Sequence, residues 1–124
     1  MRRMPVFLFA VLSAAAILWS SAAGHAEPNQ PLKDFMQVKL NHSQKVLEGL
    51  VREDYELIGK NAQEMSLLSL AETWQVLTTP EYVEYSRKFR QAADKLAEMA
   101  KKKNLDQATT AYNQVTTRCV ECHK

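Results

Sequence analysis

The sequence predicts an all-α protein that folds as an antiparallel, up-down-up-down four-helix bundle. Apolar residues recur with the helical period of about 3.6 residues in successive stretches, and no stretch alternates as a half-buried strand would. The turns expected between these stretches are two to four residues long, which favours antiparallel neighbours. Three glycines and four prolines leave little material for β-turns or for glycine-rich phosphate loops.

The first 26 residues are predicted to be a secretory signal peptide rather than part of the fold. Two arginines near the start form a positive region, Pro5 to Trp19 form an apolar run, and small residues lead to a cleavage site near Ala26. The alternative is an uncleaved membrane anchor, for which the apolar run is short. Cleavage would leave one domain, residues 27–124, in the periplasm.

The charge of this domain argues against a nucleic-acid partner. The whole chain has 16 Lys and Arg against 14 Asp and Glu, and two of the basic residues, Arg2 and Arg3, leave with the signal peptide. The remaining formal charge of zero gives no basic surface for nucleic acid. No order of Ser, His and Asp typical of a hydrolase occurs either, so we do not expect an enzyme. A domain of this size has a modest core, to which a bound cofactor could add apolar mass.

The first two helices are expected at residues 31–51 and 54–76. Pro31 suits the first position of a helix, and Asp54 suits an N-cap. The apolar face of the first helix is formed by Phe35, Met36, Leu40, Ser43, Val46, Leu47 and Leu50. The corresponding stripe of the second helix is formed by Ile58, Ala62, Met65, Leu68, Ala71 and Trp74.

The last two helices are expected at residues 80–103 and 105–123. Thr78 and Glu81 have the spacing of a capping box, with Pro80 in the first turn, and Asn104 can cap the last helix. The apolar seam of the third helix is formed by Val83, Phe89, Ala93, Leu96 and Ala100. That of the fourth helix is formed by Leu105, Ala108, Tyr112, Val115, Cys119 and Cys122.

The most informative motif is Cys119-Val120-Glu121-Cys122-His123, at the end of the last expected helix. C-x-x-C-H is the attachment signature of c-type haem. The two thiols can form thioethers with the vinyl groups of one porphyrin edge, and the histidine that follows can then reach the iron. This chemistry takes place outside the bacterial cytoplasm, in agreement with the export signal.

The cysteine pair has three other interpretations. A Cys119–Cys122 disulfide in a haem-free helical domain leaves the adjacent histidine unexplained. A thioredoxin-like redox pair normally lies at a helix N-terminus after a strand, and no strand is expected here. A zinc site needs a fourth ligand, and only His42 is spare in the exported domain.

Together, the export signal, the four expected helices and the terminal C-x-x-C-H motif resemble cytochrome c′. The soluble b-type bundle cytochrome of the periplasm shares this fold with noncovalent haem. The resemblance implies one covalent haem c, with thioethers at Cys119 and Cys122 and His123 as the proximal iron ligand. It also implies redox partner proteins or small gas ligands, and a homodimer formed through the first two helices. Cytochromes c′ usually continue past the histidine with a basic-aromatic tail, whereas this sequence ends at Lys124.

The distal side of the iron can be located by counting along the helices. His123 lies 19 residues after Asn104, and 19 residues before Arg52 is Lys33. Because α-helices rise equally per residue, the haem level on the first helix is near residues 33–38. Met36 lies there on the apolar face, where the b-type bundle cytochrome has a methionine ligand. The alternative is that Met36 only packs beside a five-coordinate iron, as in cytochrome c′.

Four aromatic residues fall near the same level and are expected to pack on the haem, with simple core packing as the alternative: Phe35, Trp74, Tyr82 and Tyr85. Lys39 is expected to bind a haem propionate or to extend along the seam. His42 is the other candidate iron ligand, but it lies about nine residues from the haem level, so we expect an exposed histidine instead. Met65 is expected in the core of the other half of the bundle.

The sequence therefore predicts an exported mono-haem c-type cytochrome that transfers electrons through iron ligated by His123 and Met36. The first alternative is a five-coordinate, cytochrome c′-like protein that binds nitric oxide or carbon monoxide. The second is the haem-free domain with a Cys119–Cys122 disulfide.

Overall fold

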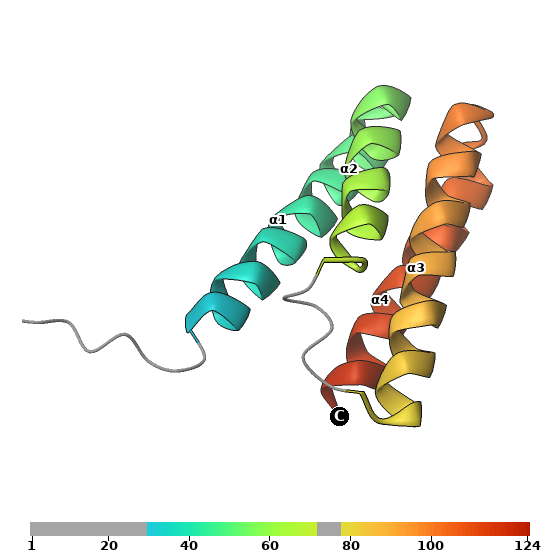
Figure 1. Ribbon diagram of the computed structural model, residues 1–124. Helices are drawn as coiled ribbons and strands as arrows, with labels where there is room; N and C mark the ends of the chain where they lie inside the picture. Colours follow the sequence, from blue (N-terminus) through green and yellow to red (C-terminus); the bar gives the residue numbers. More distant parts are fainter. Residues whose placement is uncertain (1–29, 72–77) are drawn as a thin grey trace, which may run out of the picture.

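The computed structural model describes residues 30–71 and 78–124, so the signal-peptide prediction and Trp74 lie outside the described residues. It contains four helices: α1 (Gln30–Arg52), α2 (Tyr55–Leu68), α3 (Pro80–Lys101) and α4 (Leu105–His123). Each helix packs on its neighbour in the chain, and α1 also meets α4 (Figure 1). The described residues contain no strand, and the predicted four-helix bundle is confirmed. None of the described helices is long and apolar enough to span a membrane.

The α1–α2 and α3–α4 turns end their first helix in the same way. Glu53 and Lys103 adopt left-handed backbone conformations, with φ of 53° and 54°. In each turn the next backbone N–H bonds back across the helix end, from Asp54 to the Gly49 carbonyl at 2.8 Å and from Asn104 to that of Met99 at 3.1 Å. This is the Schellman arrangement, which satisfies the last carbonyls of a helix.

The same two turns also start the next helix. The side chain of Asp54 accepts a hydrogen bond from the backbone N–H of Leu57, and that of Asn104 accepts one from Gln107, each at 3.0 Å. Both are N-caps, as predicted. The two turns lie at the same end of the bundle, so the end of α4 that carries His123 lies at the opposite end (Figure 1).

Two predicted helix ends and one predicted cap are wrong. The third helix ends at Lys101 rather than at residue 103. The second helix ends at Leu68 rather than at residue 76. The Ser69 hydroxyl donates to the Ser66 carbonyl at 2.6 Å, and Leu70 and Ala71 bond three residues back, so the chain tightens into turns there. The N-cap of α3 is Thr79, whose hydroxyl accepts from the Tyr82 N–H, rather than Thr78. Pro80 at the first helical position leaves the residue just before it to cap the helix.

The core is apolar and contains side chains from all four helices. Its fully buried members include Val46, Ile58, Met65, Leu96, Met99 and Val115. The apolar face predicted for α1 is partly wrong, because Leu40 and Leu47 are each 50 % exposed whereas Lys39 is 6 % exposed. Adjacent helical residues point about 100° apart, so the buried face of α1 is rotated toward Lys39. Val83 on α3, also predicted to face inward, is 50 % exposed.

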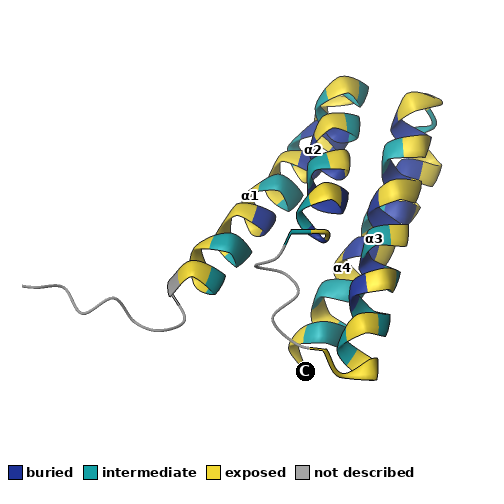
Figure 2. Ribbon diagram, in the orientation of Figure 1, coloured by how far each residue is buried: buried dark blue, intermediate teal, exposed yellow. Residues whose placement is uncertain are grey.

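Burial is uneven along the bundle (Figure 2). Buried residues extend from the two short turns through the middle of α1, α3 and α4. In the described residues 31–38, 78–85 and 116–124, none is buried. These segments contain the first turns of α1 and α3 and the last turns of α4. The helices therefore supply little core of their own at the end of the bundle that contains the C-x-x-C-H motif.

Candidate haem-binding site

The motif residues lie on the last turn and a half of α4. The helix continues to His123, so Cys119 and Cys122 lie one turn apart on the same side. Both cysteines are free thiols and half-buried, and His123 is exposed. Arg118 donates a hydrogen bond to the carboxylate of Glu121, which lies between the two cysteines in the sequence, at 2.6 Å. This carboxylate is therefore paired with Arg118.

A cavity of about 460 Å³ opens between α1 and α4 next to these residues. Its lining includes Met36, Lys39 and Ser43 from α1, Met65 from α2, and Cys119 and His123 from α4. The volume lies within the range of about 300–1,000 Å³ that is usual for small-molecule and cofactor sites. Three other hollows of the described surface are lined by no cysteine or histidine.

The electrostatics of the site link residues from three helices. Burial raises the pKa of the Cys119 thiol, and the Lys39 ammonium partly opposes this effect. Burial lowers the pKa of Lys39, and the negative charge of Cys119 and Cys122 in their thiolate form partly opposes that shift. Burial and the charge of Cys122 raise the pKa of Tyr82. Lys39 of α1 and Tyr82 of α3 therefore both lie close enough to the cysteine pair to feel its charge.

The arrangement fits a covalently attached haem. Two thiols one helical turn apart and the adjacent histidine form the required donor set, and thioether and imidazole ligands are both available at the cavity. The cavity reaches the end of the bundle where none of the residues 31–38, 78–85 and 116–124 is buried, and of its lining residues only Lys39 and Met65 are buried. An apolar macrocycle would supply the missing core there.

A comparison with protein families agrees with this geometry. The family model for cytochrome c′ matches residues 32–124, which include all of α2, α3 and α4 and most of α1. The chain belongs to the cytochrome c′ family. Comparisons with curated proteins and with solved structures find no match. Cytochrome c′ family membership indicates a haem-binding cytochrome that carries electrons or binds a small gas, and such proteins are generally not enzymes.

Met36 and His123, predicted as axial ligands, line the same cavity in this member of the cytochrome c′ family. Met36 is half-buried, and it reaches the cavity from α1 whereas His123 reaches it from α4. Met65 was predicted only as a core residue. It is fully buried and also lines the cavity, so the cytochrome has a second thioether there. The sequence contained no signal for this, because counting along straight helices placed Met65 in the other half of the bundle.

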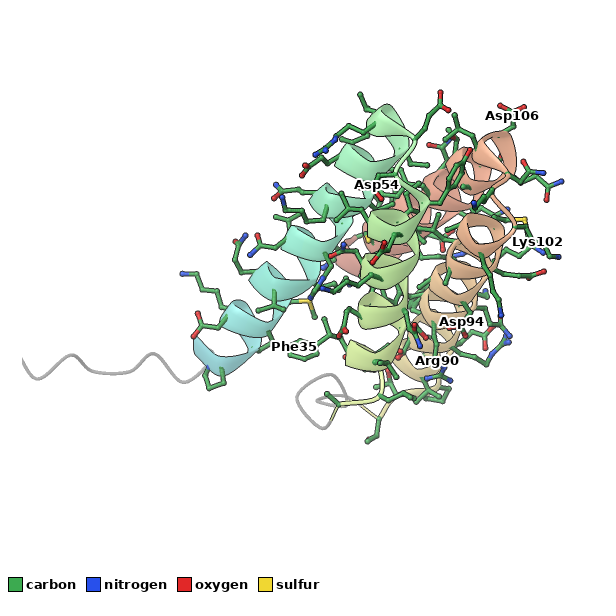
Figure 3. All side chains as sticks on the ribbon, turned by 90° about the horizontal axis from the view of Figure 1, so that it is seen from above. Phe35, Asp54, Arg90, Asp94, Lys102 and Asp106 are labelled. Carbon is green, nitrogen blue, oxygen red and sulfur yellow. The ribbon has the colours of Figure 1, made fainter. Side chains whose placement is uncertain are left out.

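Three of the four aromatic residues predicted to pack on the haem of the cytochrome are described by the structure, and Trp74 lies outside the described residues. Phe35 is half-buried and points from α1 toward the bundle, where it packs on the core (Figure 3). Tyr82 lies near Cys122, and Tyr85 is half-buried on the same turns of α3. None of these three lies in the described lining of the cavity.

His42 differs from its prediction as an exposed residue. It is half-buried, and its Nδ1 atom lies 2.8 Å from Oδ1 of Asn61 on α2. It does not line the described cavity, and no group of three or more metal-binding side chains occurs among the described residues. His42 therefore joins α1 to α2 rather than extending the site.

Proposed function

We propose that this protein is an exported, single-haem c-type cytochrome that transfers electrons. Cys119 and Cys122 hold the haem through thioethers, and His123 and Met36 bind the iron from opposite sides. The observation that carries the proposal is the cavity shared by Cys119, His123 and Met36. That cavity reaches the end of the bundle where none of the residues 31–38, 78–85 and 116–124 is buried.

Each of these side chains has a separate task. The two cysteines fix one edge of the cofactor to α4, and the position of His123 next to Cys122 presents an imidazole to the iron. Met36 approaches from α1, so the ligand pair also ties the first helix to the last. Haem supplies the one-electron chemistry when bound. A Met/His ligand pair raises the reduction potential, which suits an electron carrier.

The exposure of His123 makes the site accessible to redox partner proteins. Because His123 and Val120 are exposed, this edge of the site lies at the molecular surface, where a redox partner protein can approach. We place the protein in the periplasm, with its signal peptide cleaved near Ala26. Exposed Leu47 and Val51 on α1 supply apolar surface for the homodimer that the family resemblance implies.

The second candidate function is binding of nitric oxide or carbon monoxide at a five-coordinate iron. The observation that favours it is the incomplete burial of Met36 beside a cavity of about 460 Å³. A methionine that only lined such a cavity would leave the distal side of the iron open to a diatomic gas.

Visible spectra of the periplasmically expressed protein separate the two candidates. The spectra are recorded for the oxidised and reduced protein, with and without carbon monoxide. A low-spin reduced spectrum that carbon monoxide does not change supports electron transfer through Met36. A high-spin spectrum that shifts with carbon monoxide supports gas binding.

Two variants test the attachment itself. Exchange of His123 for alanine should remove native ligation while the mass of the protein still includes the haem. Replacement of both Cys119 and Cys122 by serine should abolish the covalent mass. If wild-type protein from a strain with a haem-attachment system never contains haem, the proposed function is wrong and the disulfide alternative takes its place.

A further inference from the structure

Lys39 is the unusual side chain of the site. It is a lysine on α1 with only 6 % of its surface exposed. Its Nζ atom lies 4.3 Å from the centre of the Phe89 ring on α3. The side chain therefore extends across the bundle interior instead of turning out to water. The negative face of an aromatic ring attracts an ammonium group, more strongly when water is excluded.

Lys39 also belongs to the cofactor cavity. It lines the cavity together with Cys119 and His123. The thiol groups of Cys119 and Cys122 are close enough to act on it electrostatically. In a haem the vinyl-bearing edge and the propionate-bearing edge lie on opposite sides of the ring. A side chain near the cysteine pair lies nearer the thioether edge, which favours a role beside the ring over the propionate role expected from the sequence.

We propose that Lys39 holds a buried positive charge beside the haem and thereby raises its reduction potential. This inference rests on the proposed function, because it requires haem at Cys119 and Cys122. In reduction, one electron passes from the redox partner to the ferric iron, which becomes ferrous and loses one unit of positive charge. No bond is formed or broken and no proton moves. A fixed cation disfavours the more positive, oxidised state, so Lys39 favours the reduced one.

The size of the effect follows from the burial of the charge. At an effective dielectric constant of about 20, two unit charges about 10 Å apart change an equilibrium roughly tenfold. Charges that face water are screened much more strongly. Lys33 provides the comparison within the same site, because it lines the same cavity from α1 but is exposed. The two lysines have the same charge and differ in burial.

The test is a redox titration of the holoprotein, with wild type compared with Lys39→Gln, Lys39→Arg and Lys33→Gln. In Lys39→Gln, the ratio of reduced to oxidised protein at a fixed ambient potential should fall about tenfold, which is 59 mV for a one-electron couple. Lys39→Arg keeps the charge and should stay within twofold of wild type. Lys33→Gln should also stay within twofold. Lys39→Leu is a second neutral variant if the glutamine side chain prevents folding.

Three results would overturn the inference. The first is an unchanged potential in both neutral Lys39 variants. The second is an equal shift in Lys33→Gln, which would indicate a general charge effect. The third is a changed coordination spectrum in Lys39→Gln, which would make Lys39 an iron ligand. Wild-type protein without covalent haem would instead contradict the proposed function, so the two failures are distinguishable.

Discussion

Tyr112 donates a hydrogen bond from its hydroxyl group to the backbone carbonyl of Ser43, with 3.1 Å between the oxygen atoms. The bond crosses from α4 to α1, and the Ser43 hydroxyl lies 3.3 Å from the same Tyr112 oxygen. Ser43 also lines the haem cavity. The pair therefore closes the α1–α4 seam at the boundary of the cofactor site.

Removal of the Tyr112 hydroxyl should loosen this boundary. We expect Tyr112→Phe to lower the free energy of unfolding by about 1 kcal/mol, because one part-buried hydrogen bond is lost. Ser43→Ala is the matched variant. It removes only the hydroxyl contact and keeps the bond to the carbonyl, so its loss should be smaller. Urea unfolding followed by circular dichroism measures both, and equal stability of Tyr112→Phe and wild type would contradict the assignment.

Two helical glycines should respond to alanine in opposite ways. A Cβ atom at Gly49 would lie 2.8 Å from Cγ1 of Ile58, 3.1 Å from the Ile58 nitrogen and 3.2 Å from the Asp54 carbonyl oxygen. Backbone atoms cannot rotate away, so the α1–α2 packing must shift, and overpacking of this kind costs about 1–3 kcal/mol.

Gly59 is the control for this prediction. A Cβ atom there would lie 3.6 Å from Cβ of Ala100, an ordinary contact. Gly59→Ala should therefore stabilise the protein by about 0.5–1 kcal/mol, the usual gain of alanine over glycine inside a helix. Thermal unfolding of the two variants should give shifts of opposite sign. A stabilising Gly49→Ala would show that the close approach of α1 and α2 is wrong.

The role of Met36 can be tested apart from that of Met65. If Met36 is the sixth ligand, Met36→Ala should convert a six-coordinate spectrum into a five-coordinate one that responds to carbon monoxide. Met65→Leu should leave the coordination unchanged, because leucine keeps the buried apolar volume. A six-coordinate spectrum that persists in Met36→Ala and is lost in Met65→Leu would assign the iron bond to Met65 instead.

The Cys119 thiol predicts a pH dependence of the haem-free protein. Burial raises the pKa of Cys119 above its value in the unfolded chain. The stability that comes from burying the neutral thiol is therefore fully present below the unfolded pKa. It falls as the pH rises from there through the folded pKa. Alkylation of a haem-free Cys122→Ser chain should show a higher midpoint pH for Cys119 when folded than in denaturant. Equal midpoints would contradict the burial of this thiol.

Much of the fold could be predicted because its start and stop signals are local. The predicted range 31–51 differs from α1 by one residue at each end, and 105–123 coincides with α4. Asp54 and Asn104 mark these turns by side-chain capping, which is visible in the sequence. The end of α2 was missed because Leu68, Ala71 and Trp74 continue the apolar period beyond it. Short serine hydrogen bonds end the helix there, and they leave only a weak sequence signal.

In the candidate site, too, the residues that could be predicted are those with a local sequence signal. The C-x-x-C-H motif is local, so its residues could be read from the sequence. Met36 could be predicted as a residue at the haem level by counting helical residues, which assumes that the helices are parallel. In the structure Met36 lines the cavity together with His123. In the structure the first turns of α1 diverge from the other helices (Figure 1). Met65 of α2 lines the same cavity, where the count did not place it. The burial of Lys39 was not predicted, because helical periodicity alone does not decide which of two adjacent residues, Lys39 or Leu40, faces the core.

The two short turns have a consequence for the order of folding. Because Glu53-Asp54 and Lys103-Asn104 each join a helix to its partner, the α1–α2 and α3–α4 hairpins can form through contacts close in sequence, which form fast. Both turns lie at the end away from His123, so neither holds the other end of the bundle together (Figure 1). We expect haem binding to join the two preformed hairpins at that end, late in folding. Hydrogen exchange should then show haem-dependent protection in the first turns of α1 and the last turns of α4, but little change beside the turns.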